Sequence, residues 1–493
     1  MFSDYLLTAG DDRRVAVIDG PLQHTHGELR SAAARLFSEL VAAGVRPGER
    51  IGLLGVNSFF WVAGYLAALK LGVVVPLSDK LGAEELGSQA QFVECAAILA
   101  DRRQLRRVAG AFAGLPVITD EVLATDGGSD WPDFRPAESD DAAMMFTSGT
   151  TAQPKVVRLT HRNLIANTSS IVTYLELGPD DRVLVILPFH YVFGASLLHT
   201  HLAVGGSVVI CNTFTFPETA VELISAHGCT GLAGVPSSYQ LLLKASSYAS
   251  RPLPSLRKVQ QAGGRLAPEL IRRLAEAQPT SRVFVQYGQT EATARLSYLP
   301  PELLETKLGS IGRGIPGVHL SVEDADGRPV EPGHHGEIIA TGDNISPGYY
   351  RDDSATEQKF RGGRLHTGDL ATVDEDGFIH IVGRSGDFIK SWGYRISPQQ
   401  VEETALRHDA VAAAVAVGLP DADAGEAVNL AVSAVPGLAL EPGEVLAFLR
   451  RQLPKHLVPA VVHVLDEIPL TTNGKVSRGA VRTLLEGRAP VLP

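Results

Sequence analysis

The chain has 493 residues, which is too long for one compact domain and sufficient for two or three. Hydrophobic residues make up 45% and charged residues 20% of the sequence, as in an ordinary globular protein. The formal net charge of −11 and the lack of a long basic run do not favour a nucleic-acid-binding protein.

The first half of the chain alternates between helix and strand patterns. Helices are predicted over residues 26–44 and 59–72, which end at Gly44 and Gly72. Strand–helix–strand repetition predicts an α/β fold in which parallel sheets are covered by helices. Short apolar runs typical of buried strands occupy residues 50–56, 73–77, 182–189, 206–212 and 230–236.

The texture of the sequence changes between about Gly309 and Gly383, where glycine-rich turns separate short strands. This pattern predicts a small, mostly antiparallel β unit, which we expect to form a β-barrel. Beyond a boundary near residue 385, we predict a smaller α+β C-terminal domain over 386–493, after an N-terminal domain over 1–385. Its predicted helices and strands cover residues 397–408, 411–419, 427–435 and 442–453.

The three cysteines, Cys95, Cys211 and Cys229, have no metal-type spacing and cannot form a closed set of disulfides. A reduced, cytoplasmic location is the natural interpretation. The N-terminal segment carries acids and arginines where a signal peptide needs an apolar core. The most apolar stretch, residues 61–77, contains Lys70 and predicts a buried helix and strand, not a membrane span.

One stretch, FTSGTTAQPKVV over residues 146–157, combines clustered hydroxyls with a lysine. Hydroxyls and backbone N–H groups in a turn bind phosphate oxygens, and Lys155 adds a positive charge. The order of residues differs from the common phosphate loop G-x-x-x-x-G-K-[ST]. A polar surface loop is the alternative for this stretch taken alone. Its candidate phosphate-binding residues are Thr147, Ser148, Gly149, Thr150, Thr151 and Lys155.

The stretch resembles the signature T-S-G-[ST]-T-G-x-P-K-G of the adenylate-forming superfamily, which includes acyl-CoA synthetases, peptide-synthetase adenylation domains and firefly luciferases. Further motifs follow in the order of that family. They are LPFHYVFG at 187–194, QAGGRL at 261–266, QYGQTE at 286–291, HTGDL at 366–370, GRSGDFIKSWGYRISPQQVE at 383–402 and PLTTNGKVSR at 469–478.

The resemblance implies an ATP-dependent acid–CoA ligase that uses ATP, Mg²⁺ and coenzyme A. A carboxylic acid and ATP would give acyl-AMP and pyrophosphate, and the CoA thiol would then take the acyl group. Two alternatives remain, an enzyme that loads the pantetheine thiol of an acyl carrier protein, and a binding protein with degraded catalysis. Consumption of free CoA would distinguish a CoA ligase from an enzyme that loads a carrier protein. Pyrophosphate exchange would distinguish either enzyme from a binding protein.

The resemblance also implies roles for the residues around ATP. Glu291 would be the magnesium ligand and Thr290 would contact the α-phosphate, while Lys475 would reach the α-phosphate from the C-terminal domain. A helix-terminal acid and a solvated loop lysine are the plain structural alternatives for Glu291 and Lys475. The adenosine would contact Tyr287 by stacking, Gln286 through the adenine amine, the glycines Gly263 and Gly264, and Asp369 and Arg384 through the ribose.

The acid would lie near His190, for which a buried core histidine is the alternative. His190 and Tyr191 follow Phe189 where relatives that activate α-amino acids carry an aspartate, so an α-amino acid is not expected. The predicted walls suit an uncharged aromatic, alicyclic or medium-chain acid. These walls are His190, Phe193, Tyr239, Gly263, Gly288 and Thr293.

The C-terminal domain of the family is mobile, and the KSWGYR segment resembles the loop that lines its pantetheine tunnel. Gly386 occupies the hinge position, where the family usually has Asp or Lys, and a plain turn glycine is the alternative. Ala152 and Val156 also replace glycines of the phosphate signature, which predicts a stiffer loop. The predicted pantetheine residues are Lys390, Trp392, Gly393 and Tyr394. The oligomeric state is not readable from the sequence.

Overall fold

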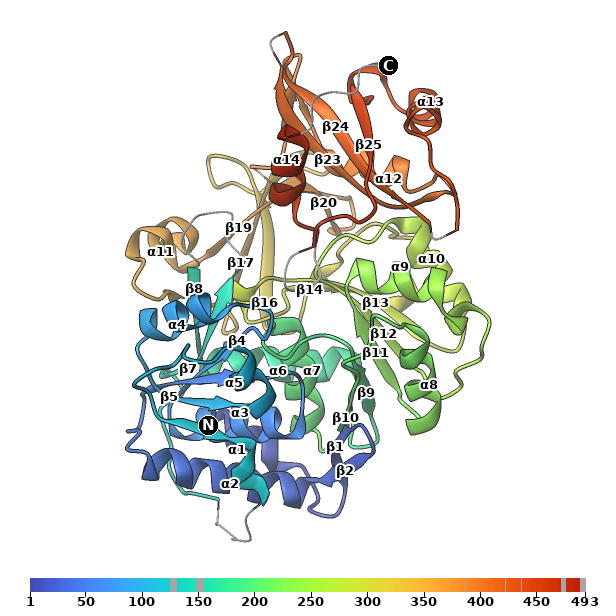
Figure 1. Ribbon diagram of the computed structural model, residues 1–493. Helices are drawn as coiled ribbons and strands as arrows, with labels where there is room; N and C mark the ends of the chain where they lie inside the picture. Colours follow the sequence, from blue (N-terminus) through green and yellow to red (C-terminus); the bar gives the residue numbers. More distant parts are fainter. Residues whose placement is uncertain are drawn as a thin grey trace.

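The computed structural model describes residues 1–124, 131–147, 155–384, 386–421, 423–435, 437–470 and 476–487. Two helix-covered sheets form the lower body in Figure 1, an antiparallel sheet lies above them, and the C-terminal unit, residues 386–487, caps the molecule. In the described part of the chain, no helix is long and apolar enough to cross a membrane.

The first sheet is largely parallel and has nine strands in the order β15-β14-β13-β12-β11-β9-β10-β1-β2. Its antiparallel pairs lie at the edges, between β1 and β2 and along β13-β14-β15. The strands are β1 (Val15–Asp19), β2 (Leu22–Thr25), β9 (Arg182–Val185), β10 (Ser207–Ile210), β11 (Gly231–Gly234), β12 (Lys258–Gln261), β13 (Arg282–Tyr287), β14 (Ser297–Leu299) and β15 (Arg313–Gly314).

The second sheet has seven strands in the order β18-β8-β7-β4-β3-β5-β6, with β8 and β18 antiparallel to their neighbours. Its parallel part confirms the α/β pattern predicted from the first hundred residues. The strands are β3 (Arg50–Leu54), β4 (Val73–Leu77), β5 (Cys95–Ala100), β6 (Val117–Thr119), β7 (Asp141–Thr147), β8 (Lys155–Thr160) and β18 (Gly348–Tyr349).

Helices α3 and α7 are buried along almost their whole length and belong to one hydrophobic core shared by both sheets. The predicted helix over 26–44 is α2, whose first turn is closed by a capping box between Thr25 and Glu28. The helices of the two-sheet body are α1 (Phe2–Thr8), α2 (His26–Ala42), α3 (Phe59–Leu71), α4 (Ala83–Phe92), α5 (Arg102–Arg107), α6 (His161–Leu175), α7 (Val192–Ala203), α8 (Glu218–His227), α9 (Pro236–Ala245) and α10 (Pro268–Ala277).

The predicted antiparallel unit is a four-stranded sheet in the order β16-β17-β19-β20. Among the described residues the strand order ends at β16 and β20, Gly312 adds an isolated bridge to Ile379 of β20, and closure into a barrel stays a prediction. Barrel closure depends on pairing between the first and last strands, which the turn pattern of a sequence does not reveal. The elements are β16 (Val318–Glu323), β17 (His335–Gly342), α11 (Asp353–Lys359), β19 (Leu365–Val373) and β20 (Ile379–Arg384).

The C-terminal unit has its own five-stranded sheet and its own hydrophobic clusters. Strands β21 to β24 pair in antiparallel fashion, and β25 lies parallel to β24. The elements are β21 (Ile389–Ser391), β22 (Tyr394–Ile396), α12 (Pro398–Ala405), β23 (Val411–Asp421), β24 (Gly425–Ala434), α13 (Pro442–Gln452), β25 (Val461–Val464) and α14 (Arg478–Glu486).

Candidate active site

The predicted site residues follow the carboxyl ends of the parallel strands. Sequence motifs that begin at residues 187, 261 and 286 lie at or just beyond the ends of β9, β12 and β13, and the phosphate-binding stretch follows β7. Carboxyl ends of parallel strands meet at one edge of a sheet, where α/β proteins bind their ligands. The motifs after β9, β12 and β13 therefore lie at one edge of the first sheet, and Tyr349, which contacts both Glu291 and Lys155, connects them to the stretch after β7 of the second sheet.

The phosphate-binding stretch is held at both ends by an antiparallel strand pair. Thr147 closes β7 and Lys155 opens β8, and the two residues face each other in register. The Thr147 hydroxyl donates to the Lys155 carbonyl at 3.3 Å, while the Lys155 ammonium lies 5.0 Å from the centre of the Tyr349 ring. Ser148, Gly149, Thr150 and Thr151 lie outside the described residues.

Glu291 lies in a short 3₁₀ turn, Thr290–Ala292, directly after β13. Its Oε1 accepts a hydrogen bond from the Tyr349 hydroxyl at 2.7 Å, and its backbone oxygen accepts one from the Ser346 amide. Magnesium prefers a small number of carboxylate oxygens together with phosphate oxygens, so this carboxylate fits the ion. Among the described residues, no group of three or more His, Cys, Asp or Glu side chains gathers as a metal cluster.

Tyr287, Asp369 and Arg384 form one hydrogen-bonded group across two sheets. The Tyr287 hydroxyl donates to Asp369 Oδ2 at 2.6 Å, and Arg384 Nε donates to Asp369 Oδ1 at 3.0 Å. Burial and the Asp369 charge raise the pKa of Tyr287, and the same carboxylate raises the pKa of Arg384. The structure thus brings together the predicted adenine-stacking residue and both predicted ribose-binding residues.

Lys359, at the end of α11, lies behind this group and was not predicted. Its ammonium donates to the Thr367 carbonyl at 2.8 Å, two residues before Asp369. Burial lowers the pKa of Lys359, and the charges of Glu291 and Asp369 oppose that shift. The segment EQKF that contains Lys359 matches no motif. Only its contacts in the structure show that this cation supports the turn before Asp369.

The predicted contact between Gln286 and the adenine amine is not supported. Gln286 is 3% exposed and its amide is used inside the protein. Its Oε1 accepts from Arg295 Nε at 2.8 Å, and its Nε2 donates to the Tyr174 hydroxyl at 2.9 Å. Successive side chains of a strand point to opposite faces, so Gln286 and Tyr287 cannot serve the same ligand face.

His190 lies beyond β9 with a buried carboxylate as its neighbour. His190 Nδ1 lies 3.8 Å from Asp79 Oδ1, and the other Asp79 oxygen lies 3.2 Å from the Lys80 ammonium. Asp79 follows β4, which pairs in parallel with β7, the strand that leads into the phosphate-binding stretch. Asp79 was not predicted, although its position just after a buried strand was the available signal.

The predicted acyl walls lie in the same region with different environments. A side chain at Gly288 would place its Cβ 1.9 Å from the Ala294 carbonyl, so only glycine fits there. Thr293 has a φ of 69°, a conformation that β-branched residues rarely adopt, and its hydroxyl donates to the Asn344 carbonyl. Tyr239 has no exposed surface and donates to the Gln260 carbonyl, so it supports the strand end from within the core.

The remaining predicted walls are small or apolar. Gly263 has a φ of 83°, in the region that favours glycine, and Phe193 is 2% exposed on the buried helix α7. A Cβ on Gly264 would meet the Pro236 ring at 3.2 Å, which limits side chains beside the strand end. At the edge of the first sheet, the backbone at Gly264 therefore packs closely against Pro236, and Phe193 supplies an aromatic ring.

The C-terminal unit contributes a tight hairpin and the segment around Lys475. Trp392 and Gly393 both have positive φ between the paired Ser391 and Tyr394, as in a two-residue type I′ hairpin. Trp392 is 66% and Tyr394 is 53% exposed, and the Tyr394 ring stacks on His456. Lys390, the remaining predicted pantetheine residue, lies on β21.

Lys475 lies outside the described residues, but the chain on either side of it is placed. Leu470 and Val476 form an isolated antiparallel bridge, and both are exposed. Two residues further on, Arg478 is anchored to Glu402 of α12 by a short ion pair. The described residues on both sides of Lys475 are therefore held by contacts within the C-terminal unit.

The predicted hinge residue, Gly386, is exposed, and a Cβ added to it would meet nothing within 4 Å. The Asp387 amide donates to the Arg384 carbonyl, so the chain turns here as it leaves β20. In this arrangement the conformation of Gly386 does not itself require glycine.

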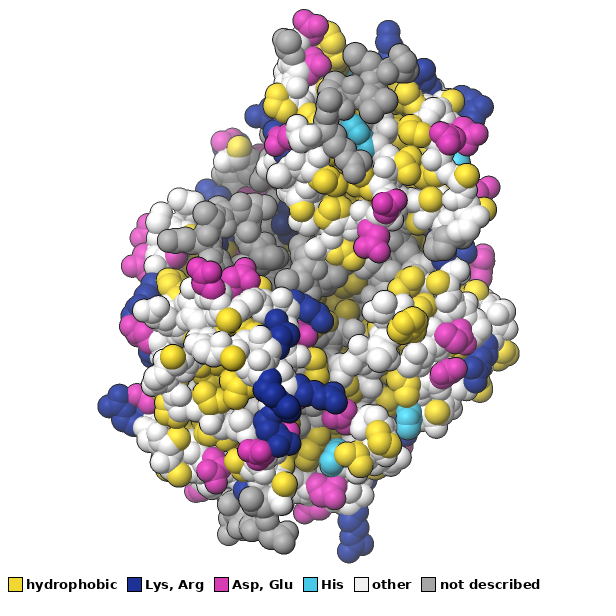
Figure 2. All heavy atoms as spheres, in the orientation of Figure 1, with side chains coloured by type: hydrophobic (Ala, Val, Ile, Leu, Met, Phe, Trp, Pro, Cys, Tyr) yellow, Lys and Arg dark blue, Asp and Glu magenta, His cyan; other side chains and the backbone are white. Residues whose placement is uncertain are grey.

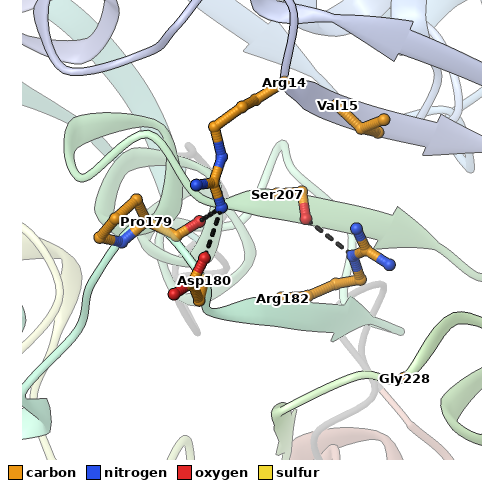
Figure 3. A pocket seen from close by; sticks show the side chains of 7 residues that line it. All are labelled: Arg14, Val15, Pro179, Asp180, Arg182, Ser207 and Gly228. Atoms are coloured by element: carbon orange, nitrogen blue, oxygen red, sulfur yellow. Dashed lines mark hydrogen bonds and ion pairs between the residues drawn. The ribbon is translucent and has the colours of Figure 1, made fainter.

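A cavity of about 300 Å³ lies at the opposite edge of the first sheet (Figure 3). Val15, Arg182 and Ser207 are the first residues of β1, β9 and β10, so the cavity lies at the amino ends of these strands. Arg14 pairs with Asp180, and Arg182 donates to Ser207, so its polar groups satisfy one another. The face shown in Figure 2 has one short cluster of Lys and Arg among scattered acids and no extended basic surface.

Comparisons with known proteins agree with the motif order. Residues 8–350 match the model of the AMP-binding enzyme family, and residues 400–475 match the AMP-binding enzyme C-terminal domain. Feruloyl-CoA synthase of an Amycolatopsis species is 34% identical to this chain, with 95% of each chain covered. Oxalate–CoA ligase of Arabidopsis thaliana is 30% identical, again with 95% of each covered.

Solved structures resemble the whole chain. ATP-bound MatB from Rhodopseudomonas palustris superimposes with a TM-score of 0.90, at 27% identity and with 99% of each chain covered. Apo MatB from the same organism gives a TM-score of 0.77, at 27% identity and with 98% of each chain covered. The present arrangement is therefore more similar to the ATP-bound structure than to the apo structure.

Proposed function

The chain belongs to the AMP-binding enzyme family and is an ATP-dependent acid–CoA ligase, and from that premise we propose how its own residues divide the two half-reactions. In the first, a carboxylate oxygen attacks the α-phosphorus of ATP, the bond to the β-phosphate oxygen breaks, and acyl-AMP and pyrophosphate form. In the second, the CoA thiol loses its proton and displaces AMP from the acyl carbon.

The nucleotide is held where the two sheets meet. Tyr287 provides the flat face for adenine, and Asp369 accepts hydrogen bonds from the ribose hydroxyls while Arg384 orients that carboxylate. Glu291 would hold magnesium, which when bound would supply positive charge to the departing pyrophosphate. Residues 147–155 bind the β- and γ-phosphates, and Thr290 contacts the α-phosphate. The observation that carries this assignment is the direct bonding of Asp369 to both Tyr287 and Arg384.

The acid and the thiol occupy the other side of the α-phosphate. His190 lies beside the acid, and Asp79 orients its ring through the Nδ1 side. The pantetheine arm passes the hairpin of Lys390, Trp392, Gly393 and Tyr394 after the C-terminal unit has reoriented about Gly386. The C-terminal domain begins at residue 386, and its own sheet and hydrophobic clusters support that boundary.

The present arrangement corresponds to the first half-reaction. Its higher similarity to an ATP-bound structure than to the apo structure of the same protein supports this assignment. In this arrangement we place the Lys475 ammonium at the α-phosphate, where it stabilises the charge that develops during acyl-AMP formation.

Lys475→Ala tests this division of work. Acyl-AMP formation, measured as pyrophosphate release, should fall about 100-fold or more, the effect of losing one preorganised donor. Thioester formation from supplied acyl-AMP and CoA should fall much less, because Lys475 is then away from the reacting atoms. Lys455→Ala, which removes an exposed lysine of the same unit, is the control and should leave both rates unchanged. Equal losses in both half-reactions would contradict the role of Lys475.

CoA is the expected acceptor, and a carrier-protein thiol remains the second candidate because the hairpin recognises only pantetheine. Free CoA consumption during thioester formation decides between them. The named relatives activate different acids, so their names do not select one. We place the protein in the cytoplasm, since its three cysteines are buried free thiols.

A further inference from the structure

Arg295 is a fully buried arginine in the loop that follows β13. The residue is 1% exposed, and its Nε donates to Gln286 at 2.8 Å. Its guanidinium carbon lies 4.0 Å from the centre of the Phe193 ring, a cation–π contact on α7. Burial lowers the pKa of Arg295, but an arginine keeps its charge in a folded protein. A permanent positive charge is therefore held away from water.

Arg295 has no carboxylate partner in the described part of the chain. Its Nη2 group is buried without a hydrogen-bond partner, and the side chains that favour its charge are Tyr174, through a hydrogen bond, and Tyr191, with no Asp or Glu of these residues as a counter-charge. An unpaired charge inside a protein is costly, so buried charges are normally paired. The donors in use satisfy only part of a guanidinium that carries five N–H groups.

Lys70 shows how the same protein accommodates a buried cation that serves the fold. Lys70 is also 1% exposed, but its ammonium lies 2.8 Å from Asp4 and faces the ring of Trp131. Lys258 is likewise paired with the buried Asp181 at 2.8 Å. In both of these places the chain itself supplies the anion.

Arg295 lies among the residues that were predicted to surround the acid. It stacks on Phe193, it follows Thr293 by two residues, and its Cα lies 2.8 Å from the position that a Cβ on Gly288 would take. Glu291, at the magnesium end of the site, belongs to the same short loop. The Arg295 guanidinium therefore lies against Phe193, one of the predicted walls of the acyl pocket.

We propose that Arg295 binds a second carboxylate of the substrate, so that the acid activated here is a dicarboxylic acid. One carboxylate reacts with ATP near His190, and the other supplies the missing counter-charge to the Arg295 guanidinium. Planar guanidinium groups bind carboxylates through two parallel hydrogen bonds, which suits recognition of a second carboxylate. This inference rests on the proposed function, because it assigns the acid of the same pocket, and it replaces the uncharged acid expected from the sequence.

The experiment compares pairs of acids that differ only at the second carboxylate. Malonate, succinate, glutarate and phthalate are each tested against the monoacid with a methyl group in that place, and against the monoamide. Pyrophosphate release with ATP and magnesium gives kcat/KM for each acid. We expect at least one dicarboxylate to exceed both of its analogues about 100-fold or more, because sites built for a polar group strongly reject analogues that lack it.

Two substitutions connect this preference to Arg295. Arg295→Met keeps the length of the side chain without its charge, and it should lower kcat/KM for the dicarboxylate about 100-fold while raising that for the monoacid. Arg295→Lys keeps the charge without the planar fork, and it should retain part of the preference. Arg282→Met, at the exposed start of β13, is the matched control and should retain the full preference.

The outcomes separate this inference from the proposed function. Turnover of monoacids at least equal to that of their dicarboxylates in the wild type overturns the role of Arg295 and leaves the ligase function intact. Thermal stabilisation of the wild type, but not of Arg295→Met, by a dicarboxylate that gives no pyrophosphate supports the inference and contradicts the function. If Arg295→Met does not fold, the paired acids with the wild-type protein alone decide the question.

Discussion

The nucleotide side of the site and the contact between the two parts of the chain are built differently. Around the proposed nucleotide site, Asp369 is bonded to Tyr287 and Arg384, and Glu291 is bonded to Tyr349. The C-terminal unit instead rests on the body through contacts that include the Arg265–Glu403 ion pair and the bond from Lys244 to the Val411 carbonyl.

The difference follows from what each region must do. Residues that stabilise charge are most effective when their positions are fixed beforehand, since no reorganisation is then needed during the reaction. A unit that changes position between half-reactions needs contacts that are individually weak. A partly exposed ion pair of 35% and 22% side-chain exposure belongs to that class. Substitutions at the hinge should therefore lower the rate of one half-reaction. Substitutions around the nucleotide should change the dependence on the ligand that the substituted residue binds or orients.

The largest effect is expected for Gly386→Pro. Proline fixes φ near −65° and restricts the preceding residue, so it blocks most of the rotation that a hinge requires. One half-reaction should remain, while the other falls about 100-fold or more, as when the second arrangement is populated 1% of the time. Pyrophosphate release and thioester formation from synthetic acyl-AMP measure the two rates separately.

Gly386→Ala is the control for this prediction. A Cβ on Gly386 meets nothing within 4 Å, so alanine fits the present arrangement and should change both rates little. If Gly386→Pro lowers both half-reactions equally in a folded protein, or lowers neither, the hinge lies elsewhere. That result would mean that the C-terminal unit does not reorient about Gly386.

An intermediate effect is expected for Tyr349→Phe, which tests whether the residues around the nucleotide are held in fixed positions. The substitution removes the hydroxyl that holds Glu291 Oε1 at 2.7 Å but keeps the ring beneath the Lys155 ammonium. The magnesium concentration for half-maximal pyrophosphate release should rise about 10-fold, the usual effect of losing a residue that orients a metal ligand. Tyr350→Phe, at the next residue, should leave the magnesium dependence unchanged. An unchanged magnesium dependence in Tyr349→Phe would mean that Glu291 is not oriented in this way.

The sequence predicted β3, β4, β9, β10 and β11 of the two large sheets, because strand and helix periodicities are local, but not β12 and β13, which the residues of the site follow. It also placed Tyr287, Asp369 and Glu291 in one site through their motifs. The adenine contact predicted for Gln286 is not supported, because its side chain is buried and bonded to Tyr174 and Arg295, and strand alternation separates it from Tyr287. Arg295 and Lys359 could not be predicted, since their environments depend on neighbours such as Phe193, about 100 residues away in the sequence.

The smallest effect is expected at the Arg265–Glu403 pair, which joins the segment after β12 to helix α12. Arg265 Nε lies 2.7 Å from Glu403 Oε1, and burial raises the pKa of Glu403. Because the pair spans the two parts, it stabilises only the present arrangement, by about 0.2–1 kcal/mol for an ion pair of this exposure. Arg265→Gln should therefore lower pyrophosphate release about two- to fivefold and leave thioester formation unchanged or slightly faster.

A double-substitution cycle assigns this effect to the pair itself. Glu403→Gln should act in the same direction, and the double variant should lose little more than either single variant, because the interaction is already absent. Arg272→Gln breaks the Arg272–Glu269 pair at 3.7 Å within the body and is the matched control. Additive losses in the double variant would show that Arg265 acts through its bond to the Ile381 carbonyl, at 3.2 Å, and not through the C-terminal unit. The contact between the C-terminal unit and the body would then depend on backbone packing and not on this ion pair. The contact would differ from the nucleotide side in the surface area that it buries and not in its charges.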